Sequence, residues 1–274
     1  MQKCICCLSS NTEFLFNTID LPAGNLNLSS SKKSSLETSL ISLNLYKCRN
    51  CSHIFNINSK INSKDYDKDV NFTWFESKSW IENSYKLADL VSNKFTSKIS
   101  YILEIGSGSG NFIRYLSSLT NLNIYAYDKT LNANNNDRQN LNIIKSLFSF
   151  DKKELPKGKP LIIMRHVLEH FKNPYAVINN LVNTFEEGFK IFIEVPNIMP
   201  TLENFRFNDF VHEHISYFSL RSLIKLITIF DGEILECINT YNDENIIAIA
   251  NFNGNKKKEL NYSEYYSIFK NNLK

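Results

Sequence analysis

The sequence has no long hydrophobic run and no strong excess of charge of one sign. No apolar stretch approaches the roughly 20 residues that span a bilayer, and the opening MQKCICC lacks the apolar core of a signal peptide. The formal net charge of +3 comes from scattered lysines, and the one basic run, Lys256 to Lys258, is typical of a solvated tail. These absences argue against membrane and nucleic-acid partners and favour a cytoplasmic protein with a small-molecule substrate.

Cysteine is scarce beyond the first 51 residues, which hold five of the six. In a chain without an export signal, disulfides are not expected, and metal ligation explains the clustering better. Cys4-x-x-Cys7 and Cys48-x-x-Cys51 are two pairs that can each give two thiolates to one tetrahedral zinc ion. Four thiolates leave no open position for catalysis, so we expect a structural zinc site, with Cys6 as an alternative to Cys7.

The rest of the chain alternates strand-like and helix-like runs. Apolar residues between about 65 and 98 recur at helical spacing and predict a helix whose inward stripe is Ile81, Tyr85, Leu87, Ala88 and Val91. Strand and helix patterns then alternate from YILEIG to KIFIEVPN, and a long insert, a helix and two strands follow. This order predicts an α/β fold: a doubly wound, mostly parallel, seven-stranded Rossmann-like sheet with a small N-terminal zinc-binding module.

We expect three parts in the chain. Residues 1–63 form the zinc-binding module, residues 64–253 form the α/β domain, and residues 254–274 form a C-terminal tail that is helical or partly disordered.

A glycine-rich turn follows the first strand of the α/β domain. Glycines at such a turn permit positive φ and let a ligand approach the backbone closely. The dinucleotide fingerprint fails here, because Asn111 stands where that motif has Gly or Ala. The spacing acidic-x-Gly-x-Gly-x-Gly is instead that of S-adenosylmethionine-dependent methyltransferases, and it predicts a cofactor site formed by Glu104, Gly106, Ser107, Gly108, Gly110, Asn111 and Phe112.

The second strand of the domain supports the same cofactor. It ends in YAYD, so Asp128 lies 22 residues past Gly106 (128 − 106), where an acidic side chain accepts hydrogen bonds from ribose hydroxyls. The two signals together predict S-adenosylmethionine at the carboxyl edge of a methyltransferase sheet.

The stretch HVLEH has the H-x-x-E-H spacing of some zinc peptidases. Its context disagrees with that function, because it directly follows the buried strand LIIM and lies beside the expected cofactor cleft. We therefore expect Arg165 and His166 to line the cofactor pocket, and Glu169 and His170 to cap or orient the loop.

The stretch FNDFVHEHISYFS holds His212, Glu213 and His214 in succession. In a strand the two histidines would share one face and Glu213 the other, whereas in a loop all three could surround a pocket. The less specific alternative is that the triplet only packs the insert against the domain.

Taken together, the paired cysteines and the segments KDYDKD, LEIGSGSGNF, RHVLEHFKNP, EVPN and HEHISYFS resemble the sugar C-methyltransferases of deoxysugar pathways over nearly the whole chain. The resemblance implies a zinc-binding N-terminal part, a central methyltransferase domain and a nucleotide-linked sugar as acceptor. It also implies that His214 is the base that removes a proton beside a ketone. Two features depart from that family. Val211 stands where the family has Tyr, and we expect the family's C-terminal domain to be missing, since the chain ends near Lys274.

This resemblance assigns roles around the acceptor. A neutral histidine suits a general base near neutral pH. Glu213 would orient His214 or bind the substrate, His212 and Tyr217 would shape the pocket, and Tyr66 would reach it from the N-terminal segment. We expect a monomeric or homodimeric enzyme that methylates a sugar or sugar-derived metabolite on carbon or oxygen. The alternative is a catalytically inactive scaffold that binds S-adenosylmethionine and zinc.

Overall fold

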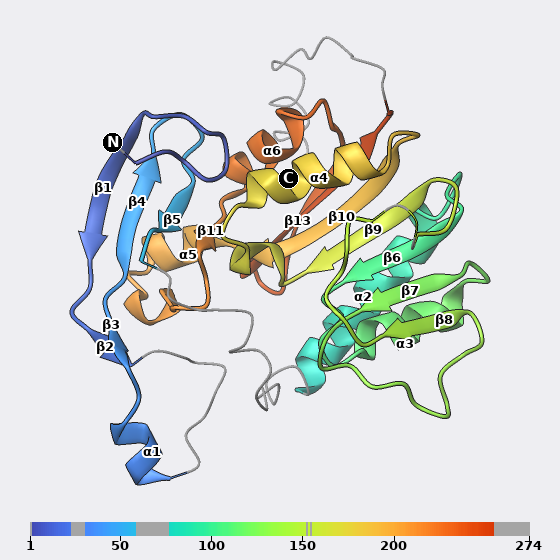
Figure 1. Cartoon of the computed structure of the whole chain (residues 1–274), viewed down its shortest axis with the longest axis horizontal. Helices are drawn as coiled ribbons and strands as arrows, with labels where there is room; N and C mark the ends of the chain where they lie inside the picture. Colours follow the sequence, from blue (N-terminus) through green and yellow to red (C-terminus); the bar gives the residue numbers. More distant parts are fainter. Residues whose placement is uncertain (1, 23–30, 59–76, 152, 154, 255–274) are drawn as a thin grey trace.

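The computed structural model describes residues 2–22, 31–58, 77–151, 153 and 155–254. They form a seven-stranded sheet with helices around it, a smaller four-stranded sheet and the two-stranded pair β2–β3 (Figure 1). Tyr66, the KDYDKD segment, the predicted boundary near residue 63 and the tail beyond Gly254 lie outside these ranges. Among the described helices, none has both the length and the apolar character needed to cross a bilayer.

The larger sheet has seven strands in the order β12-β13-β10-β9-β6-β7-β8. The strands from β10 to β8 run parallel, and β13 is antiparallel to both of its neighbours. This arrangement confirms the predicted mostly parallel, seven-stranded α/β fold. The strands are β6 (Tyr101–Ile105), β7 (Ile124–Tyr127), β8 (Leu141–Ile144), β9 (Pro160–Arg165), β10 (Phe189–Pro196), β12 (Glu233–Thr240) and β13 (Asn245–Phe252).

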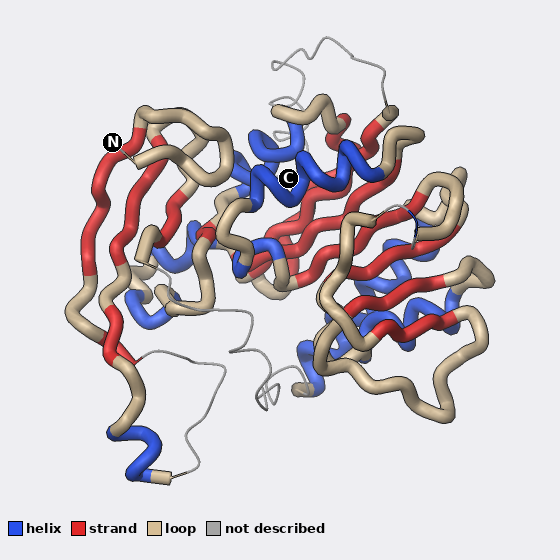
Figure 2. Tube along the Cα trace, viewed as in Figure 1, coloured by secondary structure: helices blue, strands red, loops and turns tan. Residues whose placement is uncertain are grey.

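Helices cover both faces of this sheet, as the tube in Figure 2 shows. Along β6, Ile102 packs in the cluster of α2 (Lys78–Lys94) and α3 (Asn111–Leu119). Its neighbour Leu103 packs in the cluster of α4 (Pro174–Thr184) and α6 (Leu220–Thr228). Successive side chains of a strand point to opposite faces, so a fully buried strand must be apolar on both.

The buried stripe of α2 differs in part from the predicted one. Leu87, Ala88 and Val91 are buried as expected, but Tyr85 is 37% exposed and stacks on Tyr115 of α3 with 4.1 Å between ring centroids. The stripe is completed one turn earlier, by Trp80 and Ser84. Ile81 was also expected to face inward and is only half-buried. The helix begins at Lys78, with the Ser77 hydroxyl accepting from the Trp80 amide as its N-cap.

The smaller sheet joins the N-terminal segment to the insert that follows β10. Its order is β1-β4-β5-β11, and β11 (Ser216–Tyr217) comes from the insert. Phe55 of β5 and Phe218 beside β11 lie in the same buried cluster as α4 and α6, so the two sheets share one hydrophobic core. The remaining N-terminal elements are β1 (Thr12–Asn17), β2 (Leu21–Pro22), α1 (Lys32–Leu36), β3 (Leu40–Ile41), β4 (Asn44–Cys48) and β5 (Ile54–Asn56).

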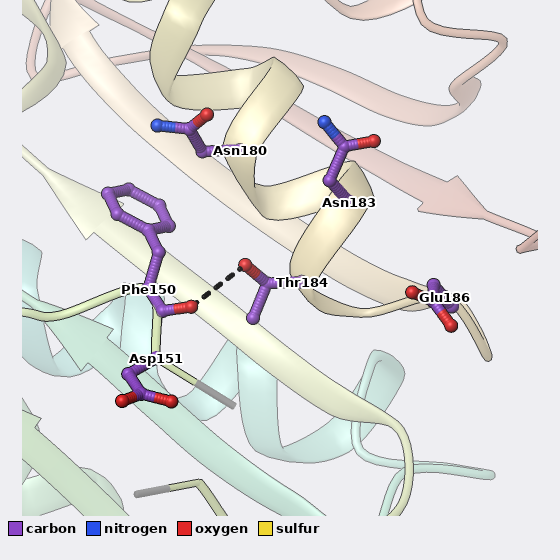
Figure 3. A pocket seen from close by; sticks show the side chains of 6 residues that line it. All are labelled: Phe150, Asp151, Asn180, Asn183, Thr184 and Glu186. Atoms are coloured by element: carbon purple, nitrogen blue, oxygen red, sulfur yellow. Dashed lines mark hydrogen bonds between the residues drawn. The ribbon is translucent and has the colours of Figure 1, made fainter. Parts of the chain in front are cut away.

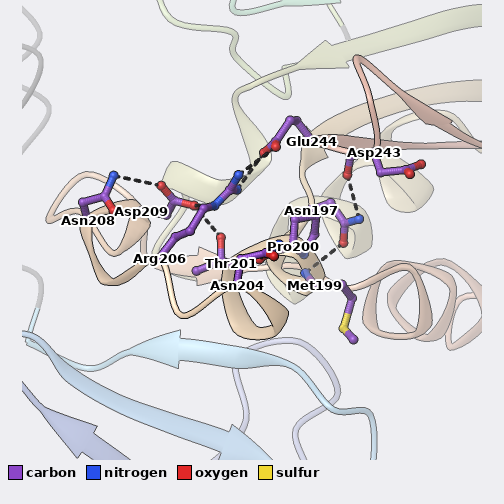
Figure 4. Close-up of polar contacts among 10 residues, drawn as sticks. All are labelled: Asn197, Met199, Pro200, Thr201, Asn204, Arg206, Asn208, Asp209, Asp243 and Glu244. Carbon is purple, nitrogen blue, oxygen red and sulfur yellow. Dashed lines mark hydrogen bonds and ion pairs between the residues drawn. The ribbon is translucent and has the colours of Figure 1, made fainter.

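The insert also contains α5 (Ile198–Glu203) and the short helix η5 (Phe207–Asp209), and polar contacts fasten it to the β12–β13 turn (Figure 4). Arg206 donates to both oxygens of Glu244 at 2.7 Å, and the Asn197 amide donates to the Asp243 carbonyl oxygen at 2.9 Å. A bidentate guanidinium–carboxylate pair fixes orientation as well as distance. The insert is therefore held both by the smaller sheet and by the edge of the larger one.

Candidate active site

Most of the predicted cofactor and acceptor residues that the structure describes meet at the carboxyl edge of the larger sheet. Because β6, β7, β9 and β10 are parallel, the glycine turn, Asp128, the helix η4 (Leu168–His170) and the insert all follow strand ends at this edge. They surround a cavity of about 890 Å³. The predicted residues that line it are Glu104, Gly106, Ser107, Gly108, Asn111, Phe112, Asp128, Arg165, His166, Glu213 and His214.

The glycine turn has the backbone conformation that its sequence requires. Gly106, Gly108 and Gly110 have φ values of +77°, +51° and +78°. A Cβ on Gly106 would lie 2.1 Å from Val167 Cγ2, whereas a Cβ on Gly108 would meet no heavy atom within 4 Å. Gly106 thus permits the turn to pack on the loop after β9, and Gly108 faces open space in the cavity. Gly110 does not line the cavity but is the N-cap of α3.

Asp128 ties the second strand end to the glycine turn. Its Oδ2 accepts from the Gly108 amide at 2.8 Å, and its Oδ1 accepts from the amide and the hydroxyl of Thr130 at 2.7 Å. The carboxylate lines the cavity while its backbone contacts fix its orientation, which suits a group that binds ribose hydroxyls.

Glu104 and Arg165 line the same cavity as the glycine turn and Asp128. Glu104 is 2% exposed, and burial raises the pKa of its carboxyl to about 7. Its Oε2 and the Ser107 hydroxyl are buried without a hydrogen-bond partner among the described residues. Arg165 Nε donates to Glu194 Oε2 at 2.6 Å, and its guanidinium lies 4.3 Å from the Phe112 ring centre. Unpartnered buried polar atoms are costly, so they mark a place where a polar ligand fits.

The segment HVLEH adopts a left-handed residue followed by one short helical turn, and it does not form the helix of a peptidase motif. His166 has φ of +53°, which is strained for a non-glycine residue. Burial disfavours a charge on His166, but the carboxylates of Glu169 and Glu194 outweigh it and raise the pKa to about 9. The ring also packs on Trp80 at 5.0 Å between centroids. His170 Nδ1 lies 2.9 Å from the Glu213 carbonyl oxygen, to which it donates. His170 thus contacts the HEH triplet, as a loop-orienting residue would.

The triplet His212–His214 lies in a turn just before β11, and its side chains do not all point to the same part of the molecule. Glu213 and His214 line the cavity, whereas His212 is buried away from it and donates from Nε2 to the Ile41 carbonyl oxygen at 2.7 Å. Tyr217 does not line the cavity either; its hydroxyl donates to the Val211 carbonyl oxygen at 2.8 Å and accepts from the Val211 amide. Both residues hold the turn that presents His214.

Further lining residues were not singled out from the sequence. Trp80 and Ser84 come from α2, Lys172 and Asn173 precede α4, and Phe148 follows β8. Position after a strand end was the only available signal for Phe148. A shallower pocket of about 340 Å³ lies alongside α4 and shares Phe150 and Asn180 with the main cavity; its other lining residues are Asp151, Asn183, Thr184 and Glu186 (Figure 3).

The four predicted metal ligands lie together in the N-terminal part. The distance is 3.7 Å between the sulfur atoms of Cys4 and Cys51 and 3.6 Å between those of Cys7 and Cys48. All four sulfur atoms lie within 4.8 Å of one another. A tetrahedral zinc ion with bonds of about 2.3 Å requires sulfur atoms about 3.8 Å apart, so this group fits the ion. Cys6 lies outside the group, with its thiol directed to the Ser222 carbonyl oxygen at 3.3 Å.

Comparison with protein families gives one match that covers more than half of the chain. Residues 78–235 match the family described as "Methyltransferase domain". In a curated relative, the C-methyltransferase NovU of Streptomyces niveus, 81 residues align at 31% identity. This alignment covers 30% of the present chain and only 19% of that relative.

Solved structures of similar shape include two that hold S-adenosylhomocysteine. The magnesium protoporphyrin IX methyltransferase of Synechocystis is 14% identical with a TM-score of 0.47, over 69% of this chain and 95% of that one. The N-methyltransferase NodS of Bradyrhizobium japonicum is 14% identical with a TM-score of 0.45, over 70% and 96%. Similarity at this level carries no argument about the acceptor.

Proposed function

Because the chain belongs to the methyltransferase domain family, which confirms the enzyme class expected from the sequence, we propose that it methylates a sugar or sugar-derived small metabolite with S-adenosylmethionine as donor. His214 is the base in this proposal. The observation that carries it is that one cavity is lined by both the glycine turn and His214.

The part of the cavity lined by Glu104, Ser107, Gly108 and Asp128, which we call the donor half, suits the cofactor in three ways. When bound, S-adenosylmethionine supplies a methyl group on a positively charged sulfur. Asp128 would accept from the ribose hydroxyls, and Gly108 leaves the backbone accessible. Glu104 and Ser107 offer buried polar atoms that the described residues leave without partners, and these suit the polar amino-acid part of the donor.

The part of the cavity lined by Glu169, His170, Glu213 and His214 is called the acceptor half. There His214 is half-buried, and burial followed by the charge of His170 lowers its pKa to about 3. The imidazole is therefore neutral in the resting protein at physiological pH, which is the protonation state that a base must have before it takes a proton from an acceptor carbon or hydroxyl. Glu213 lines the cavity beside it, and Lys172, Asn173 and Asn180 add groups that can hydrogen-bond a hydroxylated acceptor. The partial similarity to a C-methyltransferase supports carbon as the methylated atom.

In this proposal Cys4, Cys7, Cys48 and Cys51 hold a structural zinc ion. It would order the module that supplies β5, the partner strand of β11. The alternative of an inactive scaffold is not favoured, because a protein that only binds the donor has no use for a neutral imidazole in the same cavity.

The test has two steps. Calorimetry with S-adenosylmethionine measures donor binding, and a product-release assay over nucleotide-linked and free sugars measures turnover. His214→Asn should lower kcat by about 10²- to 10⁴-fold, because that is the usual contribution of a general base, while the donor Kd stays unchanged. Binding without turnover on any sugar would leave the scaffold alternative, and His214→Asn activity close to that of the wild type would remove His214 as base.

A further inference from the structure

Glu169 is a buried carboxylate that the proposed chemistry has not yet used. It lies on η4 directly after β9 and is 1% exposed. Neither of its oxygens has a hydrogen-bond partner among the described residues. A buried carboxylate is costly unless nearby positive charge compensates it, and Glu169 lines the same cavity as His214.

Three imidazoles surround this carboxylate. His166 Nδ1 lies 3.6 Å and His170 Nε2 lies 3.8 Å from Glu169 Oε1. The metal-binding atoms of Glu169, His170 and His214 all lie within 4.8 Å of one another, and the rings of His170 and His214 meet edge to face at 5.0 Å. Burial opposes ionisation of Glu169, but the contact with the protonated His166 outweighs it and lowers the pKa of the carboxyl. The carboxylate is thus an anion beside His214.

A second buried carboxylate holds this arrangement in place. His166 Nε2 lies 3.7 Å from Glu194 Oε1, and Glu194 Oε2 accepts from Arg165. Arg165, Glu194, His166 and Glu169 therefore form a row of alternating charge that leads from the donor half of the cavity to the acceptor half. Pairing of each buried charge with the next is what makes such a row tolerable in a protein interior.

We propose that Glu169 is a positioning residue that stabilises the positive charge on His214 when this histidine accepts the proton of the acceptor. The inference rests on the proposed function. In that reaction the proton moves from the acceptor carbon or hydroxyl to His214, and the electron pair left behind forms the bond to the methyl carbon. The bond between sulfur and methyl breaks with its electron pair remaining on sulfur, which becomes neutral. One positive charge thus disappears at the donor and one appears beside Glu169.

The charged groups that face His214 act on its protonation in opposite directions, so the effect of Glu169 can be distinguished from that of the others. His170 and His166 disfavour a proton on His214, as does burial, whereas Glu169 favours it. Removal of the carboxylate charge leaves only the opposing groups, so the imidazolium becomes less stable and His214 a weaker base.

The composition Glu169–His170–His214 is also that of a two-histidine, one-carboxylate metal site. The position of His166 argues against a cation there, because its ring faces the same oxygen of Glu169 and carries a positive charge of its own. Equal metal content of the wild type and Glu169→Gln, measured by elemental analysis, is the expected result. A metal ion lost only in the variant would overturn the proposal.

The main experiment compares pH profiles of kcat/KM in Glu169→Gln, Glu169→Asp and the exposed control Glu203→Gln. Glu169→Gln should lower the plateau by about 10- to 100-fold and move the acidic limb to lower pH by about one unit. Glu169→Asp keeps the charge and should recover part of the rate, and Glu203→Gln should match the wild type. A purely structural role would lower the plateau without moving the limb, which would overturn the proposal. Thermal unfolding and donor binding show that each variant is folded.

A double variant separates this inference from the function on which it rests. If Glu169 acts through His214, adding Glu169→Gln to His214→Asn should cost no more than about two-fold further activity. A large additional loss would mean that Glu169 acts elsewhere. Wild-type-like activity of His214→Asn would defeat the proposed base itself, whereas an inactive His214→Asn with an unaffected Glu169→Gln would defeat only the present inference.

Discussion

The donor half and the acceptor half of the cavity are built in different ways. In the donor half, one short segment supplies the glycine turn, and Asp128 binds that turn directly through the Gly108 amide. In the acceptor half, η4, the HEH turn and the smaller sheet must come together before His214 reaches the cavity. The acceptor half also holds Glu169, whose oxygens have no hydrogen-bond partner within the described ranges. Because the acceptor half is built from distant segments, it depends on the whole fold more than the donor half does. We therefore expect that a change elsewhere in the fold can abolish turnover without abolishing donor binding.

The largest expected effect comes from disrupting the proposed zinc site at Cys4, Cys7, Cys48 and Cys51. Cys51→Ser should abolish zinc binding and lower kcat by at least about 100-fold, because β11 pairs with β5 three residues after Cys51, and displacement of a catalytic group by 1 Å can cost that much. The donor Kd should change by less than about five-fold. Elemental analysis, calorimetry and the turnover assay measure the three quantities, with Cys237→Ser as the matched control. Loss of donor binding together with turnover would show that the halves are not separable.

Two glycines of the donor half give the next effect. Gly106→Ala places a Cβ against Val167 at a positive φ, so the free energy of unfolding should fall by about 4 kcal/mol. Gly108→Ala meets no atom of the protein and should cost only about 1 kcal/mol of strain. Its donor affinity should nevertheless fall at least about ten-fold, because a bound ligand must approach this backbone. Denaturant unfolding and calorimetry distinguish the two, and unchanged donor affinity in Gly108→Ala would place the donor elsewhere.

Substitution of Glu104 tests whether a group that favours donor binding lowers the free energy of unfolding. Its pKa is raised from an ordinary 4.5 to about 7 by burial, so the folded protein keeps a proton that the unfolded chain has lost. The free energy of unfolding therefore falls by roughly 3 kcal/mol as the pH rises from about 4.5 to 7, and it stays at the lower value above pH 7. Glu104→Gln should remove this dependence and be more stable than the wild type at pH 8, yet bind the donor about 10- to 100-fold more weakly. A variant that is less stable at pH 8 would contradict this assignment.

The difference between the halves also explains what could be predicted from the sequence. Alternation of apolar runs sufficed to predict the mostly parallel seven-stranded sheet, but it gave no indication of the strands of the smaller sheet. The glycine turn and Asp128 could be predicted because both lie directly after strands. The pairing of β11 with β5 was not predictable, since it joins two residues to a strand more than 160 positions away through no periodic pattern. For the same reason His212 was grouped with His214, although the fold directs its side chain to Ile41. The place of Tyr66 stays a prediction.

The smallest expected effect concerns Asp128, and it measures how rigid the donor half is before ligand arrives. One oxygen of this carboxylate already accepts from Thr130 and the other from Gly108, so Asn in its place keeps one acceptor and turns an amide group toward a backbone donor. The donor Kd should rise about ten-fold while kcat at saturating donor stays within about two-fold, since no contact to His214 changes. Asp231→Asn, in the turn before β12, provides the control because Asn also tolerates the φ of +59° found there. If kcat fell with Kd, Asp128 would act across both halves, and the separation between a locally built donor half and a globally built acceptor half would have to be abandoned.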